Sequence, residues 1–324
     1  MKEIRNVAVL GAGAMGAVYA SKFFDASLCS TVLVAREPRY ERLRTEGLAI
    51  NGKHYSLPVV HPDETASQAD LIIVALKNHD LAGVVGDLKN LVGPDTTLIS
   101  VMNGLDSEAC LASVYGADKV LYAIAVGIDA VREGSAVTYT NPGKIVFGEL
   151  DNSHTSERVR RVQAAFEGAA VAFETPTDMM RALWWKFMIN VGVNQASAVL
   201  RAPYGVFQSS PDARALMELL MREVIELAQH VGVNLGEQDL HEWYAVLNSL
   251  SPEGKTSMLQ DIEAGRKTEV EVFAGKVVEL GTSHGLPTPV NQTVLSIVHV
   301  LEQYRPQGTR FPGVTNHQRS RQHS

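Results

Sequence analysis

The chain has 324 residues, of which 45% are hydrophobic and 20% are charged, and its formal net charge is -7. This length is greater than that of one typical domain and suits two, while the composition is typical of globular proteins. The acidic balance disfavours a nucleic-acid partner, which needs a concentrated basic face, and favours a small-molecule ligand.

The sequence also carries no sign of a membrane or of an oxidising compartment. The first residues, MKEIRNVAVLGAG, lack the pattern of a signal peptide, and no apolar run reaches about 18 residues. The two cysteines, Cys29 and Cys110, offer neither a disulfide framework nor the spacing of a metal site. We therefore expect a cytoplasmic protein with no membrane partner and no metal.

The first half of the chain predicts a parallel sheet covered by helices. Nearly continuous apolar runs of strand length alternate with helical segments, at residues 6–13, 31–36, 70–77 and 96–103. Such runs are expected for strands that are covered on both faces. Residues 47–60 hold an Asn-Gly pair between two β-prone segments, which indicates a hairpin inserted into the sheet or lying beside it. The fold class is therefore α/β, with a doubly wound, Rossmann-like domain first.

Near residues 173–178 the apolar pattern changes to helical spacing. The helical segments that follow are 178–199, 212–232, 238–249, 268–284 and 290–304. We accordingly predict a Rossmann-like domain at 1–175 and an all-helical domain at 176–304. Residues 305–324 contain four arginines and no acid, and we expect them to form a solvated tail.

A glycine-rich motif joins the first predicted strand to the first helical segment. Gly11, Gly13 and Gly16 have the G-x-G-x-x-G spacing of dinucleotide-binding domains. The first glycine permits a tight turn, the second a close approach of the pyrophosphate, and the third close packing of helix and strand. Ala14 and Met15 lie within the motif and belong to the same predicted coenzyme site. A turn that binds nothing is the alternative.

The end of the second predicted strand indicates which dinucleotide is bound. NAD-binding domains usually place an acid there, about 20 residues past the glycines, to bind the ribose 2′-hydroxyl. This chain has Arg36, whose guanidinium suits a 2′-phosphate, with Arg39 as support and Glu37 adjoining. The position predicts NADP(H), and an ordinary solvated arginine is the alternative.

Two further predicted strands end in polar residues, Lys77 and Asn103. Ligands of open α/β sheets bind beyond the carboxyl ends of the strands, so both residues are candidates for the nicotinamide half of the coenzyme. The alternatives are a solvated lysine and a simple turn at Asn103-Gly104.

One predicted helix carries a polar stripe among large apolar side chains. In ALWWKFMINVGVN, Lys186, Asn190 and Asn194 recur every four residues and share one helix face. An ammonium in apolar surroundings is costly unless something compensates it. Aimed at a ketone, it stabilises the negative charge that hydride transfer leaves on oxygen and then donates the proton. Alternatively, Lys186 reaches solvent and the two amides bond to other helices.

Two other candidate residues lie further along the chain. Thr268 and Glu271 have the spacing of a capping box, which predicts a helix start with Glu269 in its first turn. Glu269 then either complements the helix dipole or faces a ligand. Ser257 lies in a predicted short segment between helices, where Asp261 closes a local turn or caps a helix.

Together these motifs resemble the ketopantoate reductase family, the 2-dehydropantoate 2-reductases, over nearly the whole chain up to about residue 304. In family order they are the glycine loop at 11–16, NG at 103–104, KFMINVGVN at 186–194, SMLQD at 257–261, TEVE at 268–271 and GLPTPVNQ at 285–292. The resemblance implies a Rossmann-like domain followed by an all-helical domain similar to the C-terminal domain of 6-phosphogluconate dehydrogenase. It also implies NADPH-dependent reduction of ketopantoate to (R)-pantoate, in pantothenate and coenzyme A biosynthesis, in a cleft between the domains.

The resemblance also implies roles for individual residues. By position, Lys186 is similar to the general acid of the family, and Glu269 to a cleft carboxylate that contacts the substrate. The other matched positions bind ligand: Asn190, Asn194 and Ser257 the substrate, Asn103 between substrate and coenzyme, and Lys77 the coenzyme. The chain departs from the family pattern at Ala274-Gly275, where Asn-Gly is common, so the substrate is less well defined than the reaction class.

Three other functions stay open. The chain also resembles β-hydroxyacid dehydrogenases in its Lys-x-x-x-Asn pair, and a family member that reduces a different 2-keto acid fits the same residues. A non-catalytic NADP-binding sensor is the third alternative. Among partners we expect a small-molecule 2-keto acid and no nucleic acid, and we allow for a homodimer.

Overall fold

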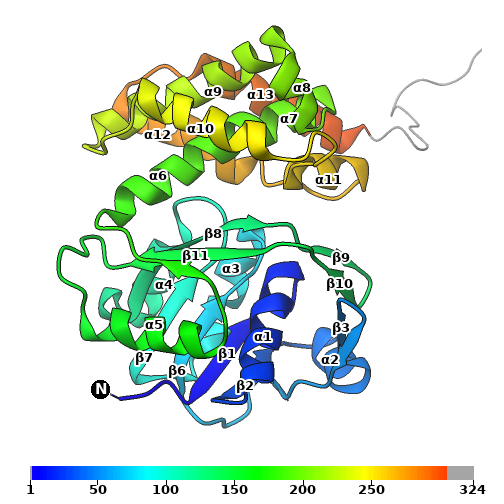
Figure 1. The fold of residues 1–324 in the computed structure, drawn as a ribbon, viewed down its shortest axis with the longest axis vertical. Helices are drawn as coiled ribbons and strands as arrows, with labels where there is room; N and C mark the ends of the chain where they lie inside the picture. Colours follow the sequence, from blue (N-terminus) through cyan, green and yellow to red (C-terminus); the bar gives the residue numbers. More distant parts are fainter. Residues whose placement is uncertain (1, 305–324) are drawn as a thin grey trace, which may run out of the picture. The chain divides into compact units, whose positions relative to one another are not determined.

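The computed structural model describes residues 2–304, so the predicted tail at 305–324 lies outside the described residues. The chain divides into two compact units (Figure 1). The first unit combines the residues up to Ile189 with Val224–Asp239, and the second combines Asn190–Glu223 with the residues from Leu240 onward. The helix that carries Lys186 is therefore counted with the Rossmann-like unit.

An eight-stranded sheet forms the centre of the first unit, in the order β12-β11-β8-β7-β6-β1-β2-β5. Its strands are β1 (Asn6–Leu10), β2 (Ser30–Val34), β5 (Val59–Val60), β6 (Ala69–Val74), β7 (Val92–Ser100), β8 (Val120–Ile128), β11 (Pro142–Gly148) and β12 (Phe173–Glu174). Every neighbouring pair is parallel except β8 with β11. The predicted doubly wound, mainly parallel sheet is confirmed.

Helices cover both faces of this sheet (Figure 1). The helices of this part of the chain are α1 (Ala14–Ala26), α2 (Arg39–Glu46), α3 (Asn78–Val84), η1 (Val85–Leu88), α4 (Ser107–Tyr115), η2 (Ala117–Lys119), α5 (Glu157–Gly168) and α6 (Met179–Ile189). In β1, Val7 and Val9 belong to the core on the side of α1 and α5, whereas Ala8 and Leu10 belong to the core with α3 and α4. Alternate residues of a strand face opposite sides, which explains why the apolar run is continuous.

A separate four-stranded sheet, in the order β4-β3-β10-β9, lies in the same unit. Its strands are β3 (Leu48–Ile50), β4 (Lys53–Tyr55), β9 (Val131–Glu133) and β10 (Ala136–Thr138). The predicted hairpin is confirmed, because β3 and β4 pair in antiparallel fashion around Asn51 and Gly52 with φ of 47° and 80°. Of the two predicted placements, the hairpin lies beside the main sheet and pairs with β10.

The chain beyond residue 178 is helical, as predicted. Its remaining elements are η3 (Asn190–Asn194), α7 (Gln195–Leu200), α8 (Tyr204–Ser209), α9 (Pro211–His230), α10 (Glu237–Ser249), α11 (Ser257–Glu263), η4 (Glu271–Gly275), α12 (Lys276–His284) and α13 (Pro289–Gln303). Both η3 and η4 are π-helical turns, which are frequent at functional sites. The turn η3 lies between α6 and α7, whereas η4 leads directly into α12. Within residues 2–304, no helix combines the length and apolar character that a membrane crossing requires.

Two local predictions are wrong in detail: the helix start at Thr268 and the segment that holds Ser257. Helical structure begins at Glu271 rather than Thr268, whose backbone N–H and hydroxyl both donate to Glu302 of α13 at 2.7 Å. Glu271 instead lies 2.8 Å from Nε2 of His299, so a contact distant in sequence replaces the local capping box. Ser257 is not in an irregular segment but is the first residue of α11, and the Thr256 hydroxyl caps that helix by accepting from the Leu259 N–H.

Candidate functional site

The glycine loop has the backbone geometry that the motif predicts. Gly11 adopts a φ of 103°, which a side chain would strain, and a Cβ there would lie 2.5 Å from the Ala75 carbonyl oxygen. A Cβ on Gly16 would lie 1.9 Å from the Gly11 carbonyl oxygen, so only glycine lets α1 start this close to the loop. Gly13 precedes the first turn of α1, which contains Ala14 and Met15. This loop and helix start fit the pyrophosphate of a dinucleotide.

An arginine that the sequence analysis missed also contacts this loop. The Arg132 guanidinium, from β9, donates through Nη1 to the Ala12 carbonyl and through Nε to the Gly134 carbonyl at 2.8 Å. Burial, together with the positive charges of Arg39 and Arg42 on α2, lowers the pKa of Arg132. Cationic groups therefore gather beside the loop. Ala12 and Arg132 are 120 residues apart in the chain, and no local motif marks their contact.

Arg36 follows β2, and acidic side chains bind its guanidinium. Its Nε donates to Oδ1 of Asp87 at 2.8 Å, and its Nη1 donates to Oδ2 of Asp63 at 3.0 Å. The Arg36 and Asp63 side chains are 44% and 55% exposed, whereas that of Asp87 is only 9% exposed. Arg36, which the sequence predicts to bind the 2′-phosphate, thus has two carboxylate partners that the sequence pattern did not reveal.

The carboxyl ends of β6 and β7 meet, as the position of Lys77 and Asn103 requires. Lys77 immediately precedes α3, and the next residue, Asn78, donates from Nδ2 to the Asn103 carbonyl at 2.6 Å. Lys77 and Asn103 are both partly exposed and make polar contacts. The structure therefore brings these two sequence-predicted residues to one edge of the sheet, with Asn78 as the link.

Lys186 lies near the carboxyl end of α6. This helix packs on the sheet through Met179 and Leu183, which join a core cluster with Ile124 of β8 and Val146 of β11. Lys186 is partly exposed, yet burial lowers the pKa of its ammonium from 10.5 to about 8. Such an ammonium is mostly charged at neutral pH and gives up its proton more readily than an ordinary lysine.

The two asparagines of the polar stripe form the ends of the π-helical turn η3. Asn190 and Asn194 are 4% and 7% exposed, and Asn194 Nδ2 donates to Asn190 Oδ1 at 3.4 Å. The two amides therefore lie side by side, as the four-residue spacing predicts. Both are buried polar groups on a distorted turn, a combination that is common where a helix presents side chains to a ligand.

Gln195, a buried residue absent from the sequence-based set, connects both π-helical turns. Its Nε2 donates to the Val191 carbonyl of η3 at 2.8 Å, and its Oε1 accepts from the Ala274 N–H of η4 at 2.9 Å. The same Nε2 donates to Oδ1 of Asn291 at 3.0 Å, and Asn291 Nδ2 donates to Glu223 at 2.7 Å. The network satisfies buried groups of three helical segments and fixes the backbone that carries the asparagines.

Glu269 and Ser257 have different environments. Glu269 is 4% exposed and precedes η4, where its carbonyl accepts from the Val272 N–H at 3.0 Å. An acid so buried is unlike the solvated first-turn residue of the helix-dipole alternative. Ser257 is exposed, whereas Asp261 is buried and binds Arg266 Nε at 2.8 Å. Asp261 therefore has a structural partner.

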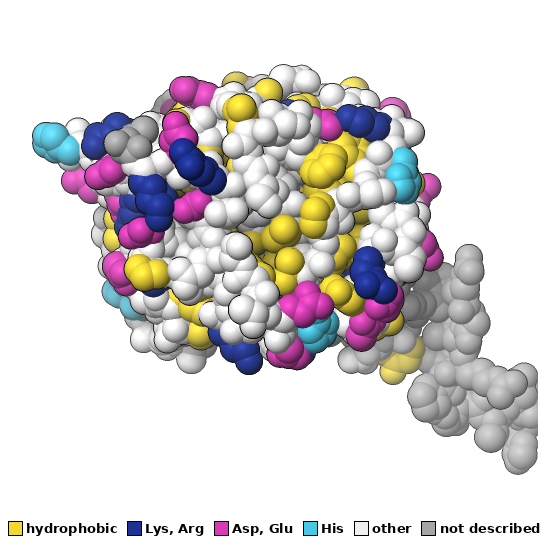
Figure 2. Space-filling model, turned by 90° about the horizontal axis from the view of Figure 1, so that it is seen from below, with side chains coloured by type: hydrophobic (Ala, Val, Ile, Leu, Met, Phe, Trp, Pro, Cys, Tyr) yellow, Lys and Arg dark blue, Asp and Glu magenta, His cyan; other side chains and the backbone are white. Residues whose placement is uncertain are grey.

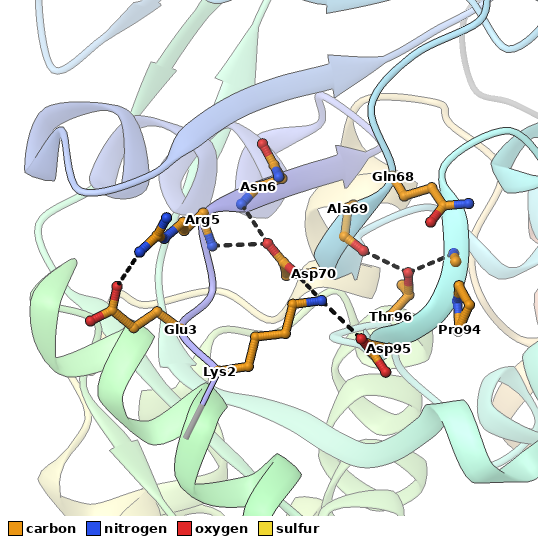
Figure 3. Close-up of a pocket in the computed structure, with 11 residues that line it drawn as sticks. Lys2, Glu3, Arg5, Asn6, Gln68, Ala69, Asp70, Pro94, Asp95 and Thr96 are labelled. Atoms are coloured by element: carbon orange, nitrogen blue, oxygen red, sulfur yellow. Dashed lines mark hydrogen bonds and ion pairs between the residues drawn. The ribbon is translucent and has the colours of Figure 1, made fainter.

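A hollow of about 690 Å³ lies at the other end of the main sheet, by the amino ends of β1, β6 and β7 (Figure 3). Its charged side chains pair with one another or with backbone. Asp70 accepts from the N–H groups of Arg5 and Asn6 at 2.9 and 3.0 Å, and Lys2 donates to Asp95 at 2.8 Å. Because coenzymes bind at the carboxyl ends of such strands, this hollow is not the coenzyme site.

Charges of both signs alternate on the surface. In the view of Figure 2, Lys and Arg side chains lie beside Asp and Glu rather than forming one basic face. Lys2 with Asp95 and Lys53 with Asp25 are exposed ion pairs of this kind. This face does not have the concentrated positive charge that phosphate backbones require.

Comparison with known proteins identifies the family. Two family patterns match: Ketopantoate reductase PanE/ApbA over residues 7–152, and Ketopantoate reductase PanE/ApbA C terminal over residues 178–302. A 2-dehydropantoate 2-reductase of Halobacterium salinarum is 26% identical over 303 residues, covering 92% of this chain and 99% of that protein.

Two solved structures share the fold. A D-mandelate dehydrogenase with NADH and anilino(oxo)acetate has a TM-score of 0.82 at 22% identity, covering 92% of this chain and 98% of that one. A dimeric ketopantoate reductase from Staphylococcus aureus has a TM-score of 0.77 at 24% identity, with the same coverage of 92% and 98%. Since the two family patterns together span most of its length, the chain belongs to the ketopantoate reductase family, whose members are oxidoreductases.

Proposed function

We propose that this chain reduces ketopantoate to (R)-pantoate with NADPH, in pantothenate and coenzyme A biosynthesis. The observation that carries the proposal is Lys186, an ammonium whose pKa is lowered to about 8 and which lies one helical repeat before Asn190 and two before Asn194, the two amides of η3. The chain also aligns with a curated 2-dehydropantoate 2-reductase over 99% of that protein's length. An acid of this strength, followed by neutral hydrogen-bonding groups, suits the reduction of a ketone that carries a carboxylate.

Lys186 would act as the general acid. The bound coenzyme supplies a hydride to the C2 ketone carbon. As that bond forms, the carbonyl oxygen gains negative charge, which the Lys186 ammonium stabilises through a charged hydrogen bond. Lys186 then donates its proton to this oxygen, the hydroxyl of the product forms, and the neutral amine regains a proton from solvent. With a pKa of about 8, Lys186 is protonated in most molecules at pH 7, and it transfers its proton to the ketone oxygen more easily than an ordinary lysine would.

The other residues of the proposed site hold the ligands. Asn190, Asn194 and Ser257 would bind substrate oxygens, and Glu269 would contact the substrate and favour the charged form of Lys186. The remaining proposed ligands belong to the coenzyme side: Gly11, Gly13, Ala14, Met15 and Gly16 at the pyrophosphate, Arg36 at the 2′-phosphate, and Lys77 and Asn103 towards the nicotinamide. Amides bind oxygens without adding charge, so they leave the ammonium and the carboxylate to set the electrostatics of the site.

The test follows nicotinamide absorbance in both directions: NADPH oxidation with ketopantoate and a panel of 2-keto acids, and NADP⁺ reduction with a panel of β-hydroxyacids. We expect ketopantoate to give the highest kcat/KM, and Lys186→Ala to lower kcat by about 10² to 10⁴ with near-native coenzyme affinity. Turnover of β-hydroxyacids alone would assign the chain to the β-hydroxyacid dehydrogenases. Coenzyme binding without turnover of any compound would indicate a sensor.

One observation favours a second candidate substrate. Ala274, buried in η4, occupies a position where the family commonly has asparagine, and its methyl group offers no hydrogen bond. With alanine in place of asparagine at this position, a 2-keto acid that has no hydroxyl group remote from its keto acid end would lose no hydrogen bond. Ketopantoate would lose one hydrogen-bond partner. Ala274→Asn separates the candidates: it should raise the kcat/KM for ketopantoate if that is the substrate and lower it for a larger apolar keto acid.

We also propose that the chain forms a homodimer, as the related ketopantoate reductase from Staphylococcus aureus is described to do. Light scattering of the purified chain measures its mass directly. A mass equal to one chain at micromolar concentration would contradict this proposal.

A further inference from the structure

The environment of Arg36 carries information on coenzyme choice beyond the arginine itself. All three guanidinium nitrogens are close to carboxylate oxygens: Nε to Asp87 at 2.8 Å, Nη1 to Asp63 at 3.0 Å and Nη2 to Asp63 at 3.5 Å. These bonds use three of the five guanidinium N–H groups, so a 2′-phosphate that binds Arg36 must share the guanidinium with the carboxylates or displace one of them. The two acids therefore compete directly with the group that Arg36 is proposed to recognise.

Asp63 lies beside the strand end at which dinucleotide-binding domains place a ribose ligand. The strands β2 and β5 pair in parallel with Val34 opposite Val60, so Arg36 and Asp63 follow neighbouring strand ends. Domains that bind NAD usually place an acid at the end of the second strand to accept from the ribose 2′-hydroxyl. Here β2 offers arginine, but the adjacent strand offers an aspartate beside it, more than half exposed.

The two carboxylates beside Arg36 disfavour a phosphate. Asp63 and Asp87 bring two negative charges next to the one positive charge of Arg36. Two further cations belong to this region: the Lys89 Nζ lies 3.9 Å from Asp63, and Arg39 begins α2. His61 is 3.7 Å from the same carboxylate and adds charge only when protonated. A phosphate monoester carries a charge between about -1.5 and -2 at neutral pH, so it meets repulsion that a neutral hydroxyl does not.

We propose that Asp63, supported by Asp87, sets the coenzyme discrimination of this chain, so that NADH is accepted nearly as well as NADPH. Asp63 accepts a hydrogen bond from the 2′-hydroxyl of NADH, and for NADPH it competes with the 2′-phosphate for Arg36. Asp87, being buried, keeps Arg36 anchored in either case. This inference rests on the proposed function only in placing the adenosine ribose at the end of β2.

Direct binding tests the idea without turnover. Dissociation constants of NADPH and NADH, measured by fluorescence titration, should differ by less than about tenfold in the unmodified chain. Asp63→Asn keeps the shape, removes the charge, and should shift the ratio towards NADPH by at least about tenfold, or 1.4 kcal/mol. Adenosine 2′,5′-bisphosphate and AMP differ in the 2′-phosphate and contain no nicotinamide. The ratio of their dissociation constants should therefore shift in the same way. Asp63→Ser, also uncharged, should move the ratio in the same direction.

Asp95→Asn is the matched control. Asp95 is likewise exposed and ion-paired, with Lys2 at 2.8 Å, but it lies near the amino end of β7. The control should leave the ratio unchanged.

A preference for NADPH above about a hundredfold, with no change in Asp63→Asn, would overturn the proposal. Binding of neither coenzyme would overturn this inference and the proposed coenzyme together. If the ratio shifts as expected while no 2-keto acid is reduced, the role of Asp63 stands and the proposed reaction fails.

Discussion

Replacing Lys186 by methionine should separate the energetic cost of its burial from its use in catalysis. Burial lowers the pKa of this ammonium from 10.5 to about 8. Each factor of ten in an acid constant corresponds to about 1.4 kcal/mol, so the charged form destabilises the folded chain by about 3 kcal/mol at neutral pH. Methionine fills a similar volume without a charge. We therefore expect the variant to be more stable, by about 2 to 3 kcal/mol at pH 7.

The dependence on pH follows from the same lowering. Between pH 8 and pH 10.5 the unfolded chain keeps a proton on Lys186 that the folded chain has lost, so the contribution of Lys186 to stability rises with pH. The advantage of the methionine variant is therefore complete below pH 8 and disappears towards pH 10.5. Urea unfolding of both proteins at a series of pH values measures the difference directly.

The same preparations should show the catalytic cost. We expect kcat to fall by about 10² to 10⁴ in Lys186→Met, because the ketone oxygen loses its proton donor. Lys53→Met is the control, since Lys53 is 61% exposed and its pairing with Asp25 is an ordinary surface ion pair, which contributes little to stability. A less stable Lys186→Met at pH 7, or a folded variant with normal turnover, would refute the reasoning.

Other substitutions test the parts of the site separately. Glu269→Gln should lower kcat/KM at least about tenfold and shift the pH–rate profile while the melting temperature hardly moves; lost stability with intact kinetics would make Glu269 structural. Gln195→Ala leaves two buried backbone groups without their side-chain partner and should cost about 2 to 4 kcal/mol in urea unfolding, with a lower kcat/KM because η3 carries the asparagines. Unchanged unfolding would show that the network adds little. Gly16→Ala places a Cβ 1.9 Å from a carbonyl oxygen and should abolish coenzyme binding in a fluorescence titration, whereas Gly83→Ala, with no atom within 4 Å of the new Cβ, should bind normally. Equal affinities of these two variants would contradict the role of the glycine loop.

The elements that could be predicted are those whose cause is local. A strand covered on both faces must be apolar at every position, and β6 is buried along its whole length, so its run is visible without knowing its neighbours. Asn51 and Gly52 accept positive φ, and together with the β-prone segments on either side they predict the hairpin. The glycine spacing follows from steric contacts within six residues, and the polar stripe from Lys186 to Asn194 follows from the periodicity of the helix, so both could be predicted.

Contacts between distant segments could not be predicted from these patterns. The Arg132 contact with the glycine loop depends on the β9–β10 hairpin, and the replacement of the predicted capping partner by Glu302 depends on how α13 packs. The link from Gln195 to both π-helical turns also depends on packing between distant segments, because its partner in η4, Ala274, lies 79 residues away.

Arg36 shows most clearly what only the tertiary structure decided. Its position after β2 is a property of the sequence, and it alone favours a 2′-phosphate. Its partners come from the segment after β5 and from η1, which are 27 and 51 residues further along the chain. The periodicity of the sequence indicates whether a residue is buried. The charges that face the residue depend on the order of the strands in the sheet, because this order decides which strand ends lie side by side. The sequence therefore determined that a dinucleotide-type loop and an arginine stand at this edge, and the packing of the sheet decided that two carboxylates surround that arginine.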